Sequence, residues 1–259
     1  MWRFLRLLFA LVLEHICLGV APEKRLCKVL LLVAHADDEI LFAGEALLGR
    51  KVRFDCYPAW HLVVATGSSP ERVEEFWRVL DILRSSTLST GITGEVWDYE
   101  DCNFMSCDLF PGKRSFKGQL IEVMQQDQWD FVVTHNLQGE YHHKQHIGLF
   151  NAVEELFKER PDVVGSASFW VFNPLPEFNT SVSNFKMNLL KEYFLSSPTM
   201  ARGLTFNTLS KFTEHLVPAK QFARPTLLGA GFTQETLLQI GIPFWYSFIY
   251  MPGAIHLTA

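Results

Sequence analysis

The chain has 259 residues, of which 48% are hydrophobic and 20% are charged, a composition typical of a globular protein with a sizeable core. Its net charge of −5 contains no long block of either sign, which argues against nucleic-acid binding, because surfaces that bind phosphates are usually basic. We therefore expect a small neutral substrate and no nucleic-acid partner.

Residues 1–21 are the segment with features of a targeting signal. Two arginines flank the start of a seven-residue apolar run, Leu7–Leu13, and the small residues Gly19 and Ala21 could form a signal-peptidase site. Seven apolar residues are too few to span a bilayer. A signal peptide, a helix lying on a membrane surface and a packed N-terminal helix all remain open.

The five cysteines form no CxxC pair or array that would indicate a metal or redox site. They are Cys17, Cys27, Cys56, Cys102 and Cys107. We interpret them as reduced structural thiols and expect a cytoplasmic protein. Export or membrane association through residues 1–21 is the alternative.

From Lys28 onward, strand-like and helix-like segments alternate. In chain order the pattern predicts a strand at 29–34, a helix at 38–49, a strand at 61–66, a helix from 70 to about 84, a weaker strand at 95–98, a helix at 117–126, a strand at 130–134, a helix at 143–159, a strand at 167–172 and a helix at 185–195. The strands are continuous apolar runs, as in a parallel sheet that is covered on both faces.

This alternation predicts βαβ units and an α/β fold, with a Rossmann-like, mostly parallel sheet and helices on both faces. We expect residues 28–259 to form one domain and residues 1–27 to be a separate apolar segment. Beyond Pro174 the pattern is less regular, and we expect this part to shape the substrate cleft.

Two polar clusters directly follow two of the predicted strands. The first is residues 35–39 (HADDE), after strand 29–34; the second is His135 with residues 139–146 (GEYHHKQH), after strand 130–134. Ligands bind at the carboxyl ends of parallel strands, where both clusters lie. So many carboxylates and imidazoles are costly to pack together unless a cation compensates them.

The spacing within each cluster suits a metal. His35 and Asp38 are three residues apart, and His143 and His146 are three apart on one face of the expected helix start. Two histidines and a carboxylate with an open position are the usual ligands of a catalytic zinc ion. No GxGxxG follows the first strand, which argues against a dinucleotide cofactor.

The segments AHADDE (34–39) and GEYHHKQH (139–146) resemble the motifs AHPDDE and GEYGHPDH of the LmbE-like, or PIG-L, de-N-acetylase family. The resemblance covers most of the chain from Lys28. It implies a Rossmann-like fold and zinc-dependent hydrolysis of N-acetylglucosamine-type substrates. By motif position, His35, Asp38 and His146 resemble the zinc ligands, and Asp37 resembles the general base.

Four further residues match functional positions of the family. Tyr141 and His143 resemble the groups that stabilise the oxyanion and protonate the leaving amine. Arg72 and Asp101 match substrate-binding or histidine-orienting positions. The resemblance therefore implies an enzyme, a metal-dependent N-deacetylase.

The chain departs from the family motifs at four positions: Ala36 replaces proline, His142 replaces glycine, and Lys144-Gln145 replaces Pro-Asp. None of these changes removes a ligand or the base, so we expect activity on an N-acetyl amino sugar or its conjugate. The alternatives are a catalytically silent sugar-binding protein on the same fold, an amidase of a thiol–sugar conjugate, and a membrane-bound enzyme for a glycolipid. The sequence leaves the sugar, the aglycone and the oligomeric state open.

Overall fold

The computed structural model describes residues 25–49, 54–86, 91–101, 115–173, 175–176, 184–193, 212–213 and 215–222. The predicted N-terminal segment lies outside these residues up to position 24, so its three interpretations stay predictions. None of the described helices combines the length and the apolar character needed to cross a membrane.

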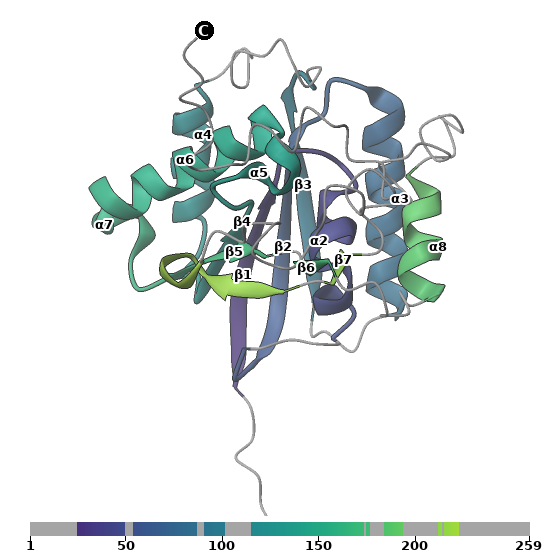
Figure 1. The fold of residues 1–259 in the computed structure, drawn as a ribbon, viewed down its shortest axis with the longest axis horizontal. Helices are drawn as coiled ribbons and strands as arrows, with labels where there is room; N and C mark the ends of the chain where they lie inside the picture. The colour runs from purple at the N-terminus through teal and green to yellow at the C-terminus, as the bar shows by residue number, and fades with distance from the viewer. Residues whose placement is uncertain are drawn as a thin grey trace, which may run out of the picture.

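A six-stranded sheet forms the centre of the described part (Figure 1). The strand order is β3-β2-β1-β4-β5-β8; the first five strands are parallel, and β8 is antiparallel to β5. The strands are β1 (Leu26–Val33), β2 (Tyr57–Thr66), β3 (Ile92–Tyr99), β4 (Phe131–Thr134), β5 (Ser168–Phe172) and β8 (Leu216–Pro218), and a separate antiparallel pair joins β6 (Leu175–Pro176) to β7 (Phe212–Thr213). The predicted mostly parallel α/β sheet is confirmed.

Helices cover both faces of this sheet (Figure 1). Because side chains alternate along a strand, Leu31 and Val33 of β1 enter one buried core, and Leu30 and Leu32 enter the other. The first core is closed by α2 (Asp38–Leu47), α3 (Pro70–Ser86) and α8 (Asn184–Glu192), and the second by α4 (Phe116–Gln125), α6 (Lys144–Glu159) and α7 (Pro161–Val164). A 3₁₀ turn, Ala219–Gln221, follows β8.

The strand order reverses between β1 and β4. The chain builds β2 and β3 outward on one side of β1 and then returns to place β4 on the other side, with Leu31 opposite Val133. Ligands of open α/β sheets bind at such a switch point, at the carboxyl ends of the two central strands. Both polar clusters of the sequence therefore emerge side by side.

The predicted helix at 143–159 is confirmed except for its first residue. Residues Gly139–His142 form a separate turn, α5, and α6 begins at Lys144. Between them His143 is extended, with φ −64° and ψ 124°. The turn α5 was not predicted, and its first two residues, Gly139 and Glu140, both take positive φ, 61° and 55°.

Cys27 and Cys56 form a disulfide at the amino ends of β1 and β2. Both are buried, and their Cα atoms lie 5.8 Å apart. The interpretation of these two residues as reduced thiols is therefore wrong. The parallel register pairs Leu26 with Tyr57, which brings together two cysteines that are 29 residues apart in sequence. The other three cysteines lie outside the described residues.

Candidate metal centre

The turn between β1 and α2 is closed by hydrogen bonds within the first motif. The His35 N–H donates to Asp38 Oδ2 (2.9 Å), so the carboxylate folds back over the end of the strand. Asp37 occupies the N-cap position with φ 135°, a conformation that L-residues rarely adopt. Its carbonyl accepts the N–H groups of Ile40 (3.0 Å) and Leu41 (2.8 Å), which starts the helix.

Three atoms from the two motifs meet at one point. His35 Nδ1 lies 3.1 Å from Asp38 Oδ2 and 3.1 Å from His146 Nε2, and His146 Nε2 lies 3.2 Å from Asp38 Oδ2. Ligand atoms on a tetrahedral zinc ion are about 3.3–3.6 Å apart, given metal–ligand distances of about 2.0–2.2 Å. The predicted ligand set is therefore assembled at nearly the spacing that zinc requires.

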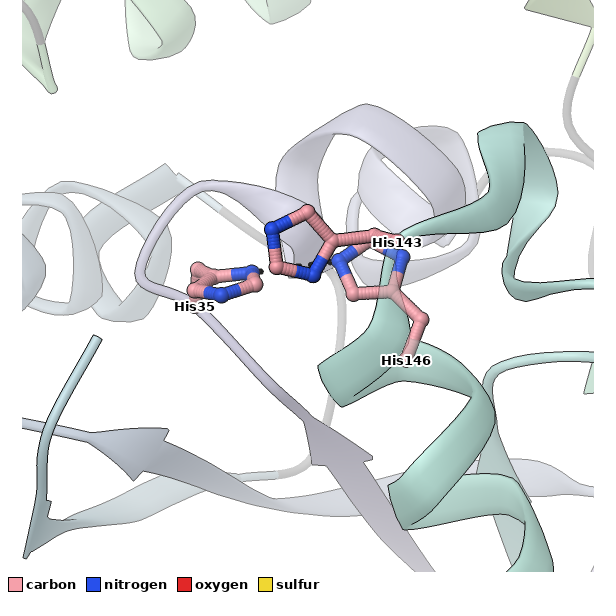
Figure 2. A group of neighbouring side chains, drawn as sticks. All are labelled: His35, His143 and His146. Atoms are coloured by element: carbon pink, nitrogen blue, oxygen red, sulfur yellow. Dashed lines mark hydrogen bonds between the residues drawn. The ribbon is translucent and has the colours of Figure 1, made fainter. Parts of the chain in front are cut away.

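His143 lies beside this triangle. Figure 2 shows the rings of His35, His143 and His146 gathered between the end of β1 and the start of α6. The His143 ring centroid is 4.4 Å from that of His35 and 4.7 Å from that of His146. One nitrogen from each of the three rings lies within 4.8 Å of the others, so these histidines could also hold a metal. The shorter distances to Asp38 favour the predicted set.

A buried carboxylate, Glu140, orients His146, one of the predicted ligands. The Nδ1–H groups of His146 (2.8 Å) and His135 (2.7 Å) both donate to Glu140 Oε2, and the Asn136 N–H donates to Oε1 (2.9 Å). With Nδ1 protonated, Nε2 of His146 is left as the acceptor that faces Asp38. A carboxylate behind the distal nitrogen is the usual support of a metal-bound histidine. The sequence analysis quoted Glu140 without giving it this role.

Gln145 supports the other histidine ligand. Its side-chain N–H donates to the Glu100 carbonyl (2.8 Å), which fixes the amide so that Oε1 accepts the Nε2–H of His35 (2.8 Å). The Asp101 carboxylate lies 3.4 Å from the same Nε2 and is half exposed. Asp101 therefore lies where a histidine-orienting residue is expected, and Gln145, which replaces the aspartate of the family motif, contributes the shorter contact.

The hydrogen bonds to Gln145 and Glu140 assign the protons of His35 and His146 to their outer ring nitrogens, which leaves the two inner nitrogens as acceptors. With the distal nitrogens of His35 and His146 protonated, their inner nitrogens and Asp38 Oδ2 all present lone pairs to one point. Buried acceptors at such distances repel unless a proton or a metal cation lies among them. The chemistry of the donor set therefore fits a divalent metal.

His135 belongs to the supporting layer and is not a ligand in this arrangement. Its Nε2 lies 3.5 Å from Asp38 Oδ2 and, together with Asp38 and His146, could also face a metal. However, that nitrogen accepts the Ala34 N–H at 3.0 Å, which occupies its lone pair. The ring instead stacks on His146, with centroids 3.7 Å apart.

Arg72, at the start of α3, contacts both the side chain of Asp37 and the backbone of the preceding residue. Its guanidinium lies 3.2 Å from Asp37 Oδ2, donates to the Ala36 carbonyl and lies 3.3 Å from Glu75 Oε2. The structure thus gives Arg72 the contacts of a residue that positions Asp37. Its predicted role in substrate binding stays a prediction.

Burial shifts the pKa values of several groups in this centre. It raises the pKa of Asp37 to about 6, against the opposing charge of Arg72, and that of Glu39 to about 8. The pKa of Glu140 is also raised by burial. Burial lowers the pKa of His135 to about 3 and that of His143 well below its ordinary value. At neutral pH His135 is therefore uncharged, as its contacts require.

The structure thus brings together all but one of the predicted site residues. Those gathered at the switch point are His35, Asp37, Asp38, Arg72, Asp101, His143 and His146. Tyr141 lies in α5, but its side chain is outside the described part of the structure. Its predicted role therefore stays a prediction.

No protein-family model matches the sequence. An uncharacterised protein of Acanthamoeba polyphaga mimivirus is 28% identical in a match that covers 45% of this chain and 52% of the relative. The match thus spans about half the length of that relative.

The solved structures that resemble the chain include the following three. N,N'-diacetylchitobiose deacetylase from Pyrococcus horikoshii has a TM-score of 0.45 and 15% identity, over 78% of this chain and 88% of that one. A conserved protein from Thermus thermophilus has a TM-score of 0.44 and 14% identity, over 74% and 94% of the two chains. The 4-carboxy-2-hydroxymuconate hydratase of Pseudomonas putida has a TM-score of 0.40 and 20% identity, over 74% and 93%.

Proposed function

We propose that this protein is a zinc-dependent hydrolase that removes the acetyl group from an N-acetylated amino sugar. The observation that carries the proposal is the triangle of His35 Nδ1, Asp38 Oδ2 and His146 Nε2, with edges of 3.1–3.2 Å. Its two histidines and one carboxylate match the ligand class of hydrolytic zinc sites, in which a fourth position remains open. The resemblance to the LmbE-like motifs supplies the substrate class.

When bound, zinc supplies Lewis-acid chemistry that polarises an amide carbonyl and makes a water molecule acidic near pH 7. The chain supplies the remaining groups. Asp37 directly precedes the ligand Asp38, and its carboxylate is the base that accepts the proton of the attacking water. General-base assistance of this kind typically contributes about 10²–10⁴-fold to the rate.

The geometry around Asp37 supports this role. Its backbone is held at φ 135°, and Arg72 fixes its carboxylate at 3.2 Å. Strained residues persist only where the surroundings hold them, and they concentrate at active sites, where the fixed geometry is part of the mechanism. Fixing the base before substrate binds lowers the cost of reaching the transition state.

His143 and Tyr141 are the groups that we assign to the later charge changes. The ring of His143, beside the two predicted histidine ligands, offers an N–H to the developing oxyanion. Because burial keeps this ring uncharged, the proton that the leaving amine needs is the one that Asp37 takes from the water. Tyr141, two residues earlier in the chain, is assigned from its motif position.

We also propose that the chain matures in an oxidising compartment, the exported alternative to a cytoplasmic protein. The support is the disulfide between Cys27 and Cys56, because structural disulfides form and persist mainly in secreted and luminal proteins.

Acetate release tests the proposed function. The protein is stripped with a chelator, reloaded with zinc, and incubated with a panel of free and conjugated N-acetylhexosamines, including a thiol–sugar conjugate. We expect acetate and free amine in equal amounts from at least one N-acetyl sugar, loss of release in the stripped protein, and recovery on reloading.

The panel also separates the alternatives. Release from the thiol–sugar conjugate alone would make the protein an amidase of that substrate class. A zinc-loaded protein that binds an N-acetyl sugar and releases no acetate would be a silent sugar-binding protein, and the proposed function would be wrong.

A further inference from the structure

The strained turn at Asp37 is held by a residue more than 150 positions later in the chain. Asp37 has φ 135° and ψ −25°, and such a conformation needs partners on both its backbone and its side chain. The partner of the Asp37 backbone and the partner of its side chain both contact Tyr193, the buried residue that directly follows α8.

The first connection reaches the backbone of Asp37. The Asp37 N–H donates to Glu39 Oε2 (3.1 Å), and the Tyr193 hydroxyl donates to the other oxygen, Glu39 Oε1. The side chains of both Glu39 and Tyr193 lie inside the protein, with 1% and 0% of each residue exposed. When Glu39 is protonated, its Oε1–H can donate to the Tyr193 hydroxyl oxygen instead, so Oε2 remains an acceptor for Asp37 in both protonation states.

The second connection reaches the side chain of Asp37. Arg72 Nη1 donates to the Tyr193 carbonyl (2.7 Å), and the guanidinium carbon lies 5.5 Å from the centre of the Tyr193 ring, within cation–π range. The other guanidinium nitrogen, Nη2, lies 3.2 Å from Asp37 Oδ2. Tyr193 thus fixes Arg72, and Arg72 fixes the carboxylate.

The helix that carries Tyr193 is itself docked on the motif helix. α8 packs against α2 and α3, beside which it lies in Figure 1. The buried Lys186 ammonium of α8 donates to the Leu41 carbonyl of α2 (2.9 Å). The position of Tyr193 is therefore tied to the helix that Asp37 starts.

We propose that Tyr193 is a positioning residue for the reaction: acting through Glu39 and Arg72, it holds Asp37 in its reactive conformation. The catalytic consequence rests on the proposed function, because it takes Asp37 as the base. The structural consequence, a restrained Asp37 backbone, does not depend on the substrate.

Tyr193→Phe tests the proposal because it removes the hydroxyl and keeps both the ring and the carbonyl that face Arg72. We expect kcat to fall about 10–100-fold, as for other small displacements of a catalytic group, with KM changed less than about twofold. Zinc content and the visible spectrum of the cobalt-substituted protein should not change, because Tyr193 touches no ligand. Tyr57→Phe is the matched control: Tyr57 is exposed at the amino end of β2, away from the site, and its loss of a hydroxyl should change nothing.

Two further measurements decide between positioning and a general structural role. In an Asp37→Ala background, Tyr193→Phe should lower kcat no further, because a residue that acts through Asp37 has nothing left to position. Hydrogen exchange of the Asp37 amide should be at least about 10-fold faster in Tyr193→Phe than in wild type. Glu39→Leu should reproduce both effects, and it replaces Tyr193→Phe if that variant does not fold.

An unchanged exchange rate, or a Tyr193→Phe effect that persists in full without Asp37, overturns the proposal. The exchange measurement needs no substrate. If wild type releases no acetate from any sugar while the amide of the variant exchanges faster, the proposed function fails and Tyr193 still holds the turn.

Discussion

Glu140→Gln is the substitution whose effect on the metal centre follows most directly from the structure. The two oxygens of Glu140 face three N–H donors: the rings of His135 and His146 at Oε2, and the Asn136 backbone at Oε1. Glutamine offers one acceptor oxygen and two N–H donors. Either orientation of its amide therefore sets an N–H against another N–H inside the protein, where the Glu140 side chain is 1% exposed.

The expected loss can be worked from these contacts. If the amide oxygen stays with the two histidines, the Asn136 N–H loses its acceptor; if it turns, His146 loses the partner that holds Nε2 toward Asp38. Removing the partner that orients a metal ligand typically weakens binding about 10–100-fold. That range corresponds to about 1.4–2.7 kcal/mol of binding free energy. We expect the Kd for zinc to rise by this amount.

The assay is competition for zinc between the protein and a chromophoric chelator of similar affinity, at fixed pH and ionic strength. Glu154→Gln is the matched control, because Glu154 lies on the exposed side of α6 and pairs only with Lys158 among the ion pairs found (2.9 Å). Its Kd should equal that of wild type. If Glu140→Gln folds like wild type by circular dichroism and binds zinc within about twofold of it, Glu140 does not orient the ligand.

Three other variants test the remaining parts of the structure. His146→Ala should lose most of its zinc, because one of three protein ligands is gone; full metal content by elemental analysis would show that the ligand set is wrong. Asp37→Ala should keep its zinc and lose turnover about 10²–10⁴-fold in acetate-release kinetics, since a base is removed and no ligand; loss of zinc would instead make Asp37 a ligand. The double variant Cys27→Ala/Cys56→Ala should unfold with a free energy about 3–4 kcal/mol lower in urea titrations, the loop-closure value for a bridge across about 29 residues. A change below about 1 kcal/mol would mean that the bridge does not restrain the unfolded chain.

The sheet could be predicted from the sequence because its central strands are continuous apolar runs. The starts of β1 and β2 were missed by three and four residues, since Leu26 and Tyr57 at these ends are 60% and 52% exposed and follow no buried pattern. The turn Gly139–His142 was missed for a different reason. It depends on positive φ values at Gly139 and Glu140, and at Gly139 an added Cβ would come within 2.8 Å of Ile147. The residue types of this segment reveal neither the positive φ values nor the close approach of Ile147 to Gly139.

The proximity of His35, Asp38 and His146 could be predicted because these residues lie in two short motifs that each follow a central strand. Their supporting residues could not. Glu140 contacts His135 and His146, and Gln145 contacts His35 and Glu100. These contacts form only once β1 and β4 pair, so the sequence does not distinguish the two residues from the other polar residues of the second motif. The disulfide could not be predicted either. Two cysteines 29 residues apart are seen to be neighbours only when the parallel register of β1 and β2 is known.

The distribution of backbone strain connects the fold to the proposed chemistry. Among the described residues, the non-glycine residues with positive φ are Asp37 and Glu140, one in each motif. Each is restrained by a carboxylate: Glu39 accepts the Asp37 N–H, and the side chain of Glu140 accepts the Asn136 N–H and two ring N–H groups. Conformations of this kind cost about 1–3 kcal/mol each, so they survive only because these buried hydrogen bonds offset the cost. The strain fixes the proposed base on one side of the switch point and the residue that supports a proposed metal ligand on the other. A site that is rigid before substrate arrives spends less of its binding energy on reorganisation, which is how preorganised hydrolytic centres stabilise their transition states.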